Sequence, residues 1–195
     1  RIDEIIVTAT KRATSLQDTA LSVSAISGAD LSKLGVTSFE QIMNTVPGVT
    51  VIQSGPGSSF LSYRGISTSP SGGSGPGPST NTYVDGIPLA FGAGTGNAAI
   101  KLIDMERVEV MKGPQGTLYG RSAMSGAMRF ITKKPDFEAI AGGISITGEN
   151  VASGGTGYQG QGYLNMPLSD NVAVRAVFYN HDGAGFIDNL GTNTK

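Results

Sequence analysis

The sequence contains no cysteine and no tryptophan, and His181 is its single histidine among 195 residues. Without cysteine there is no disulfide framework, thiol nucleophile or cysteine-ligated metal site. One histidine excludes a multi-histidine zinc site and leaves little for histidine-based catalysis. His181 has the same parity as the polar positions of an alternating segment, so we interpret it as a residue on the solvated face or at the end of a strand.

Charge is also scarce, because Asp, Glu, Lys and Arg together make up 15% of the chain, against about 25% in ordinary soluble domains. The net charge is −1, which predicts no broad attraction to nucleic acid. No apolar run approaches the roughly 18 residues of a membrane helix. Glycine, in contrast, is abundant at 29 residues. The composition indicates a loop-rich, β-rich chain with less solvated surface than usual.

A stretch rich in glycine, KGPQGTLYG, runs from Lys112 to Gly120 between two strand-like segments. A phosphate-binding loop requires G-x-x-x-x-G-K-[ST], but here the spacing is too long and Arg121 follows the last glycine. The nucleophile motif G-x-S-x-G is absent, and the acidic residues form no metal-binding pattern. We therefore predict no enzyme activity, no cofactor and no metal site.

Short strands and helices alternate over the first 135 residues. Strands are predicted over 4–9, 21–26, 49–53, 60–66, 82–89, 106–111 and 127–132, and helices over 29–34, 39–46 and 99–105. Residues 10–20 have the polarity of a connection. Asp85-Gly86 is a hairpin signal. Residues 67–82 carry no charge and no large apolar side chain, which is typical either of a flexible linker or of a long functional loop within one domain.

The pattern changes after about Glu138. Long segments there alternate strictly, with Ile144 and Ile146, then Leu164 and Met166, on one parity and polar residues on the other. This pattern fits transmembrane β-barrel strands. It also fits an antiparallel sheet with one solvated face, which periodicity alone favours because such sheets are commoner. Three such strands cannot close a barrel, so in the first case we expect the chain to be an N-terminal fragment.

Five motifs in order decide between these alternatives. They are EIIVTAT near the N-terminus, SFEQIMNTVPGVTV, YRGIS, YVDGIPL and ERVEVMKGPQGTLYGRSAMSGAMRFITKKP. Together they closely resemble the plug domain of TonB-dependent outer-membrane receptors, continuously from Ile2 to about Pro135. The segments after Glu138 resemble the first strands of the receptor barrel.

The resemblance implies an α+β plug, a mixed sheet with short helices and long loops, followed by antiparallel strands of a barrel that has about 22 strands in the full family member. The implied divisions are residues 1–12 as an N-terminal extended segment, 13–138 as the plug and 139–195 as about three barrel strands. The implied location is the outer membrane, with the N-terminus in the periplasm.

The implied activity is active transport of a scarce ligand, with the plug gating the barrel. TonB, energised through ExbB and ExbD, is the implied partner, together with outer-membrane lipid. An iron–siderophore is the first expectation for the ligand, and haem, cobalamin, a glycan or an aromatic compound are alternatives. The residues that match the TonB box are Glu4, Ile5, Ile6, Val7, Thr8 and Ala9. A short apolar extended segment suits strand addition to a partner.

Further site residues follow from the same resemblance. Arg64 and Lys112 match basic plug positions that pair with barrel glutamates and latch the plug. Residues expected to face the ligand in an apical loop are Ser69, Ser71, Ser74, Ser79 and Asn81. Residues expected to form structural turns are Gly65, Gly86, Gly113, Pro114, Gly116, Gly120 and Gly126.

The sequence departs from the family pattern at Ser122, Ser125 and Arg129. Arg129 adds a charge within an apolar strand, and the sequence names no partner for it. Two alternative functions stay open. One is a signalling receptor of the same family, which would carry an extra N-terminal domain. The other is a soluble β-rich binding or adhesion domain.

The latch assignment predicts that Arg64→Ala loosens the plug in the receptor. A paired charge in a wet lumen is a modest restraint, so its loss should raise passive leak without abolishing folding. Leak of a small solute from liposomes that contain the receptor measures this. An unchanged leak rate would argue against a latch at Arg64.

Overall fold

The computed structural model describes residues 5–34, 39–55, 58–67, 79–89, 102–120, 122–152 and 154–183. The chain forms two compact units, residues 1–132 and residues 133–195, which are described separately. No helix in the described ranges is long and apolar enough to cross a membrane.

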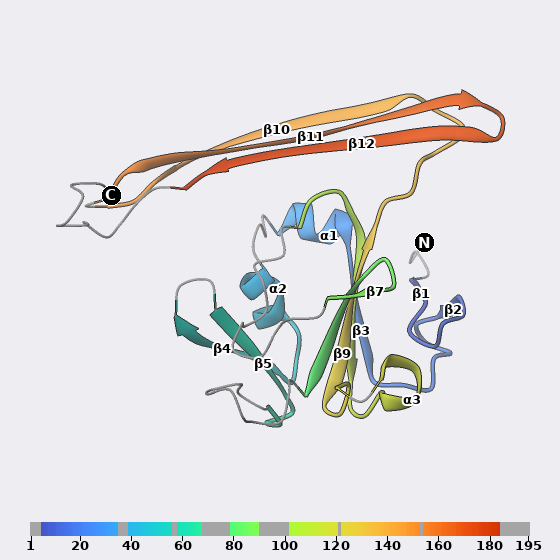
Figure 1. The fold of residues 1–195 in the computed structure, drawn as a ribbon, viewed down its shortest axis with the longest axis vertical. Coiled ribbons are helices and arrows are strands. Elements are labelled where there is room, and N and C mark those ends of the chain that lie inside the picture. Colours follow the sequence, from blue (N-terminus) through green and yellow to red (C-terminus); the bar gives the residue numbers. More distant parts are fainter. Residues whose placement is uncertain are drawn as a thin grey trace. The chain divides into compact units, whose positions relative to one another are not determined.

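A five-stranded mixed sheet forms the centre of the first unit (Figure 1). Its strand order is β3 (Val23–Ser27), β8 (Met105–Lys112), β9 (Gly126–Thr132), β6 (Thr80–Val84) and β7 (Ile87–Pro88). β9 pairs antiparallel with β8 and parallel with β6. Strands from distant parts of the sequence therefore meet at β9.

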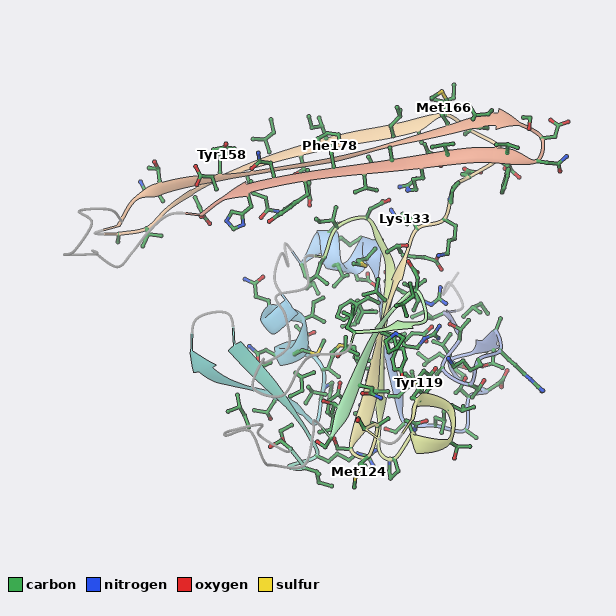
Figure 2. All side chains as sticks on the ribbon, viewed as in Figure 1. Tyr119, Met124, Lys133, Tyr158, Met166 and Phe178 are labelled. Carbon is green, nitrogen blue, oxygen red and sulfur yellow. The ribbon has the colours of Figure 1, made fainter. Side chains whose placement is uncertain are left out.

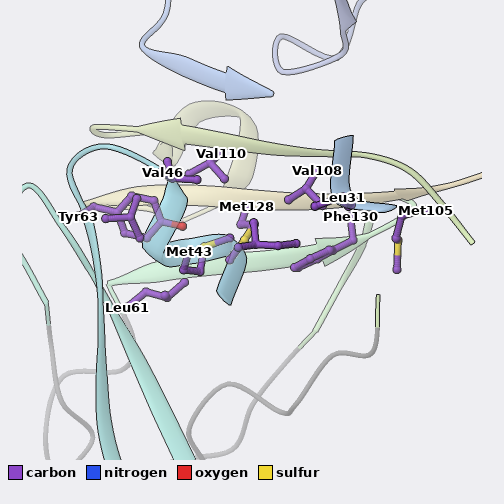
Figure 3. Close-up of a cluster of buried hydrophobic side chains, with 12 residues drawn as sticks. Leu31, Met43, Val46, Leu61, Tyr63, Met105, Val108, Val110, Met128 and Phe130 are labelled. Carbon is purple, nitrogen blue, oxygen red and sulfur yellow. The ribbon is translucent and has the colours of Figure 1, made fainter. Parts of the chain in front are cut away.

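One face of this sheet packs against α1 (Gly28–Lys33), α2 (Phe39–Thr45) and the hairpin of β4 (Val49–Gly55) with β5 (Ser58–Tyr63). Ser27 begins α1 by accepting a hydrogen bond from the backbone N–H of Asp30, as an N-cap should. The core on this face, shown in Figure 3, contains Leu31, Ile42, Met43, Val46, Val49, Leu61, Tyr63, Met105, Val108, Val110, Met128 and Phe130.

The opposite face is covered by the N-terminal segment, which holds β1 (Ile6–Val7) and β2 (Thr14–Ser15), and by the one-turn helix α3 (Gly116–Tyr119). A second core lies there and contains Ala9, Tyr83, Met111, Tyr119, Ala123 and Ala127. The central strands are thus buried on both faces, and the apolar residues of β8 and β9 are shared between the two cores.

The turns are tight where the sequence places glycine. Asp85 and Gly86 both have positive φ, 47° and 86°, the geometry of the predicted aspartate-glycine hairpin. Arg64 and Gly65 also have positive φ, 52° and 81°. β5 therefore ends at Tyr63, and the strand predicted over 60–66 is too long at its C-terminal end.

Two further predictions are wrong in the first unit. A helix is predicted over 99–105, of which the structure describes residues 102–105. These residues are not helical, and Met105 begins β8 and is buried in the first core. The polar connection predicted over 10–20 contains β2, which pairs with β1 through Ile6 opposite Ser15. The sequence also did not predict α3, whose single turn carries too short an apolar pattern to detect.

The second unit is a three-stranded antiparallel sheet of β10 (Ala141–Asn150), β11 (Thr156–Ser169) and β12 (Val172–Asp182). Register places Ile144, Leu164 and Phe178 on one face. Ile144 and Ile146 on β10 are 72% and 76% exposed, and Figure 2 labels Tyr158 and Met166 on β11 and Phe178 on β12. The opposite face carries Asn165, Arg175 and His181.

Gly126 in β9 is closely packed on both sides. A methyl group there would lie 2.6 Å from the carbonyl oxygen of Met111 and 2.8 Å from the ring of Tyr63. We predict that Gly126→Ala lowers the opening free energy of β8 and β9 by about 1–3 kcal/mol through overpacking. Hydrogen exchange of the β8 and β9 amides in the receptor measures that free energy.

Gly116→Ala is the matched control, because nothing lies within 4 Å of a methyl group at Gly116. It should leave the exchange of β8 and β9 unchanged. Equal effects of the two variants would contradict a steric role for Gly126.

Candidate functional site: the docked N-terminal segment

The predicted TonB box lies along the second face of the sheet from Ile5 onward, and Glu4 lies outside the described residues. Among its described residues, Ile5 and Ile6 are 37% and 45% exposed, whereas Val7 and Ala9 are fully buried. In the described part of the chain, β2 is the only strand that pairs with β1. The segment therefore combines an accessible, partly unpaired start with an anchored end.

Thr8 is the point at which the segment is held. Its backbone N–H donates to Glu109 Oε1 at 2.8 Å, and its carbonyl oxygen accepts from Arg129 Nη1 at 2.6 Å. Its hydroxyl lies 2.5 Å from the same Arg129 nitrogen and 3.2 Å from Arg107 Nη2. Charged side chains thus bind both the donor and the acceptor of this residue, and hydrogen bonds to charged groups are the stronger kind.

Glu109 is the centre of a buried charge cluster. The carboxylate has no exposed surface, and it pairs with Arg107 Nε at 2.8 Å and with Arg129 Nη1 at 3.0 Å. Glu109 and Arg129 stand directly opposite each other in the antiparallel register of β8 and β9. Arg107 also pairs with the more exposed Glu106. The structure thereby supplies the partners of Arg129 that the sequence did not name.

Sequence reasoning missed Glu109 and Arg107 as members of this site. A signal was present, because Glu109 lies between Val108 and Val110 and Arg129 lies between Met128 and Phe130. Opposite charges embedded in two apolar strands indicate a buried pair. Which strands pair, and in which register, is not visible in either segment alone.

A second contact fixes Ala9. The Tyr119 hydroxyl donates to the Ala9 carbonyl oxygen at 2.7 Å. Burial, opposed by Arg129 and reinforced by Glu109, raises the pKa of Tyr119, so the phenol stays protonated as a donor. The Tyr119 carbonyl oxygen in turn accepts from the Tyr83 hydroxyl and from Asn81 Nδ2, both at 2.7 Å. Lys11 lies 4.9 Å from the centre of the Tyr119 ring, within reach of a cation–π contact.

The two predicted latch residues lie apart from this cluster. Lys112 Nζ donates to Ser24 Oγ at 3.0 Å and to the Pro47 carbonyl oxygen at 3.3 Å, both neutral acceptors of the first unit. The Arg64 side chain is exposed, and its backbone N–H donates to the Gly48 carbonyl oxygen at 2.7 Å. Pairing of either residue with a barrel glutamate stays a prediction.

The predicted ligand loop is only partly described, because Ser69, Ser71 and Ser74 lie outside the described residues. Ser79 is buried, and its backbone carbonyl oxygen accepts from the Ser125 hydroxyl at 3.0 Å. Asn81 is bound to Tyr119 as described above. Both residues therefore make structural contacts at the start of β6, and a role in binding ligand stays a prediction.

The predicted turn residues fall into different environments. Gly113 and Gly120, like Gly65 and Gly86, have positive φ, a conformation that glycine adopts without strain. Gly126 lies in β9 rather than in a turn. Gly116 lies within α3 without positive φ, and Pro114 precedes that helix.

The described residues contain no group of three acidic or histidine side chains that could hold a metal ion. His181 lies on β12, where its Nδ1 is 3.0 Å from the Tyr179 hydroxyl and its Nε2 is 3.6 Å from a Glu149 carboxylate oxygen. It is thus bound within the polar face of the second unit.

A comparison with family models gives a direct match over residues 15–127, to the TonB-dependent Receptor Plug Domain. The chain belongs to this family. The predicted receptor class and the predicted mixed-sheet plug fold are thereby confirmed.

Named relatives agree with this assignment. The Pesticin receptor of Yersinia pestis is 31% identical over 178 residues, which cover 89% of this chain and 24% of that protein. The Ferrioxamine B receptor of Salmonella typhimurium is 32% identical, with 89% and 24% covered. The crystal structure of the ferric yersiniabactin uptake receptor FyuA from Yersinia pestis matches with a TM-score of 0.62 at 29% identity, covering 80% of this chain and 24% of that one.

The chain thus spans about a quarter of the length of the curated relatives it matches. It carries the plug domain of this family, and the named relatives are receptors. Family membership rules out the soluble adhesion domain. The divisions at residues 12 and 138 stay predictions, and along the chain the boundary between the two compact units falls between Thr132 and Lys133.

The Tyr119 contact predicts a measurable weakening of docking when its hydroxyl is removed. Tyr119→Phe leaves the buried Ala9 carbonyl oxygen without this donor, at a cost of about 1–3 kcal/mol. A spin label attached through Ile6→Cys should become more mobile in the electron paramagnetic resonance spectrum of the receptor.

Tyr83→Phe provides the control, because Asn81 still donates to the Tyr119 carbonyl oxygen when the Tyr83 hydroxyl is lost. This variant should change label mobility little. A label that stays equally immobile in Tyr119→Phe would show that the hydroxyl does not hold the segment.

Proposed function

We propose that the chain is the plug and first barrel strands of a transporter that imports a ferric siderophore across the outer membrane, driven by TonB. The observation that carries the proposal is the division of the N-terminal segment at Thr8. Ile5 and Ile6 are accessible, and β1 pairs with one strand only in the described part of the chain. Such a segment can add to a partner's sheet edge while still attached to the plug.

The second unit supports a membrane location for the strands that follow the plug. β10, β11 and β12 have 10, 14 and 11 residues, long enough for tilted strands that need about 9–11 residues to span a bilayer. Ile144, Ile146 and Phe178 stand exposed on one face. An exposed apolar band along long strands is suited to lipid.

The ligand class rests on the relatives. One is named for ferrioxamine B, and another is described as a ferric yersiniabactin uptake receptor. Both names refer to iron chelates, so a ferric siderophore is the proposed cargo. Because this chain spans 24% of such a relative, the uptake assay below is designed with a panel of siderophores.

In this mechanism the plug closes the barrel, and TonB draws the N-terminal segment away so that the plug rearranges. Arg64 and Lys112 serve as proposed latches between plug and barrel. Lys112 already has neutral acceptors at Ser24 and Pro47. Exchange of these contacts for a carboxylate would let the latch close and reopen at small cost.

Uptake of radioactive iron by cells that lack their other siderophore receptors tests this function. We expect the receptor to import at least one ferric siderophore from a panel that includes ferrioxamine B. Uptake should fall to background without TonB, and also when residues Ile5 to Thr8 are deleted. Binding of the same siderophore to the deletion variant should persist, because the deleted residues belong to the proposed TonB segment.

Cobalamin and maltodextrin serve as cargo controls, and neither should be imported. Import of one of these with no import of any ferric siderophore would overturn the cargo proposal. Full siderophore uptake by the deletion variant would overturn the TonB-segment proposal and leave the cargo proposal standing.

A further inference from the structure

The cluster of Glu109, Arg129 and Arg107 holds the backbone of Thr8 on both sides of its Cα. Thr8 contributes one backbone donor and one backbone acceptor to it, at 2.8 Å from Glu109 and 2.6 Å from Arg129. β1 ends at Val7, so Thr8 lies just beyond the strand pairing. Both of these hydrogen bonds are made by side chains and not by the backbone of a neighbouring strand. Two side chains therefore take the place of a neighbouring strand at Thr8.

We propose that Glu109 and Arg129 are positioning residues that clamp the backbone of Thr8 and set how readily residues 5–10 leave the plug. The inference deepens the proposed function, since this is the segment assigned to TonB. The accessible part of the segment is available for capture. The clamp lies immediately after it and opposes its withdrawal.

The charges explain how the clamp can open without damage to the plug. Glu109 keeps Arg107 and Arg129 as partners on β8 and β9 when Thr8 departs. A buried carboxylate left without partners would cost several kcal/mol. Glu109 avoids this cost because Arg107 and Arg129 belong to the same sheet and remain paired with it. Within this cluster, withdrawal of the segment breaks only the contacts to Thr8, and the ion pairs remain.

The clamp depends heavily on one nitrogen. Arg129 Nη1 contacts the Thr8 carbonyl oxygen, the Thr8 hydroxyl and Glu109 Oε2. Within the described residues, the buried Arg129 Nε has no hydrogen-bond partner. The guanidinium is therefore oriented toward Thr8 although one of its N–H donors stays without an acceptor. A single substitution of Arg129 removes its contacts with Thr8.

Hydrogen exchange in the full-length receptor without TonB tests the clamp directly. Arg129→Gln should speed exchange of the amides of residues 5–10 by about tenfold to a hundredfold, the effect of losing a hydrogen bond to a charged group. Amides in β4 and β5 should keep their rates. Arg129→Lys should restore part of the protection, since an ammonium can still donate to the Thr8 carbonyl oxygen.

Two further variants separate the clamp from general destabilisation. Thr8→Val removes only the hydroxyl and leaves both strands intact, so it should speed exchange in the same residues by a smaller factor. Lys33→Gln removes a positive charge from α1, where the side chain is exposed, and should change nothing in residues 5–10.

The proposal fails if residues 5–10 exchange at the wild-type rate in both Arg129→Gln and Thr8→Val. It also fails if Arg129→Gln accelerates the whole first unit equally while Thr8→Val has no effect. Neither outcome depends on TonB or on cargo. A failed uptake assay with the expected exchange pattern would count against the proposed transport function alone.

Discussion

The antiparallel pairing of β8 with β9 is the interaction on which the rest of the first unit depends. These strands supply side chains to both cores, and their register sets Glu109 opposite Arg129. Burial on both faces favours apolar strands, yet Glu109, Arg107 and Arg129 lie within this pair. They are tolerated because Glu109 pairs with both arginines and because Thr8 makes further hydrogen bonds with Glu109 and Arg129. The N-terminal segment thus covers this face of the sheet and also supplies hydrogen-bond partners to its charged side chains.

Features governed by neighbours in sequence were predictable. The Asp85-Gly86 hairpin follows from the left-handed conformation that these residues adopt, and its two positive φ values agree. The two-faced strands after Glu138 follow from alternation, which register then places on opposite faces. The family itself was predictable because five motifs occur in order, and the plug match covers residues 15–127.

Features that depend on distant residues were not predictable. Thr8 and Glu109 are 101 positions apart, and Thr8 and Arg129 are 121 apart. No local pattern specifies such contacts, so Arg129 had no partner in the sequence and Glu109 was read only as part of an alternating strand. β2 and α3 escaped for a different reason, because elements of two and four residues are shorter than the period that would reveal them.

The hairpin at Asp85 also determines how the chain leaves the first unit. The Asp85 carboxylate accepts from the backbone N–H of Thr132 at 3.1 Å and from its hydroxyl at 2.6 Å. Strand ends ordinarily fray, but Thr132, the last residue of β9, is held by these two hydrogen bonds to one carboxylate. Pro135 then restricts the backbone of Lys134 and fixes its own φ. The link to the second unit therefore starts as a stiff tether, and a pull on residues beyond it would load the β6–β7 hairpin before it could peel β9 from the sheet.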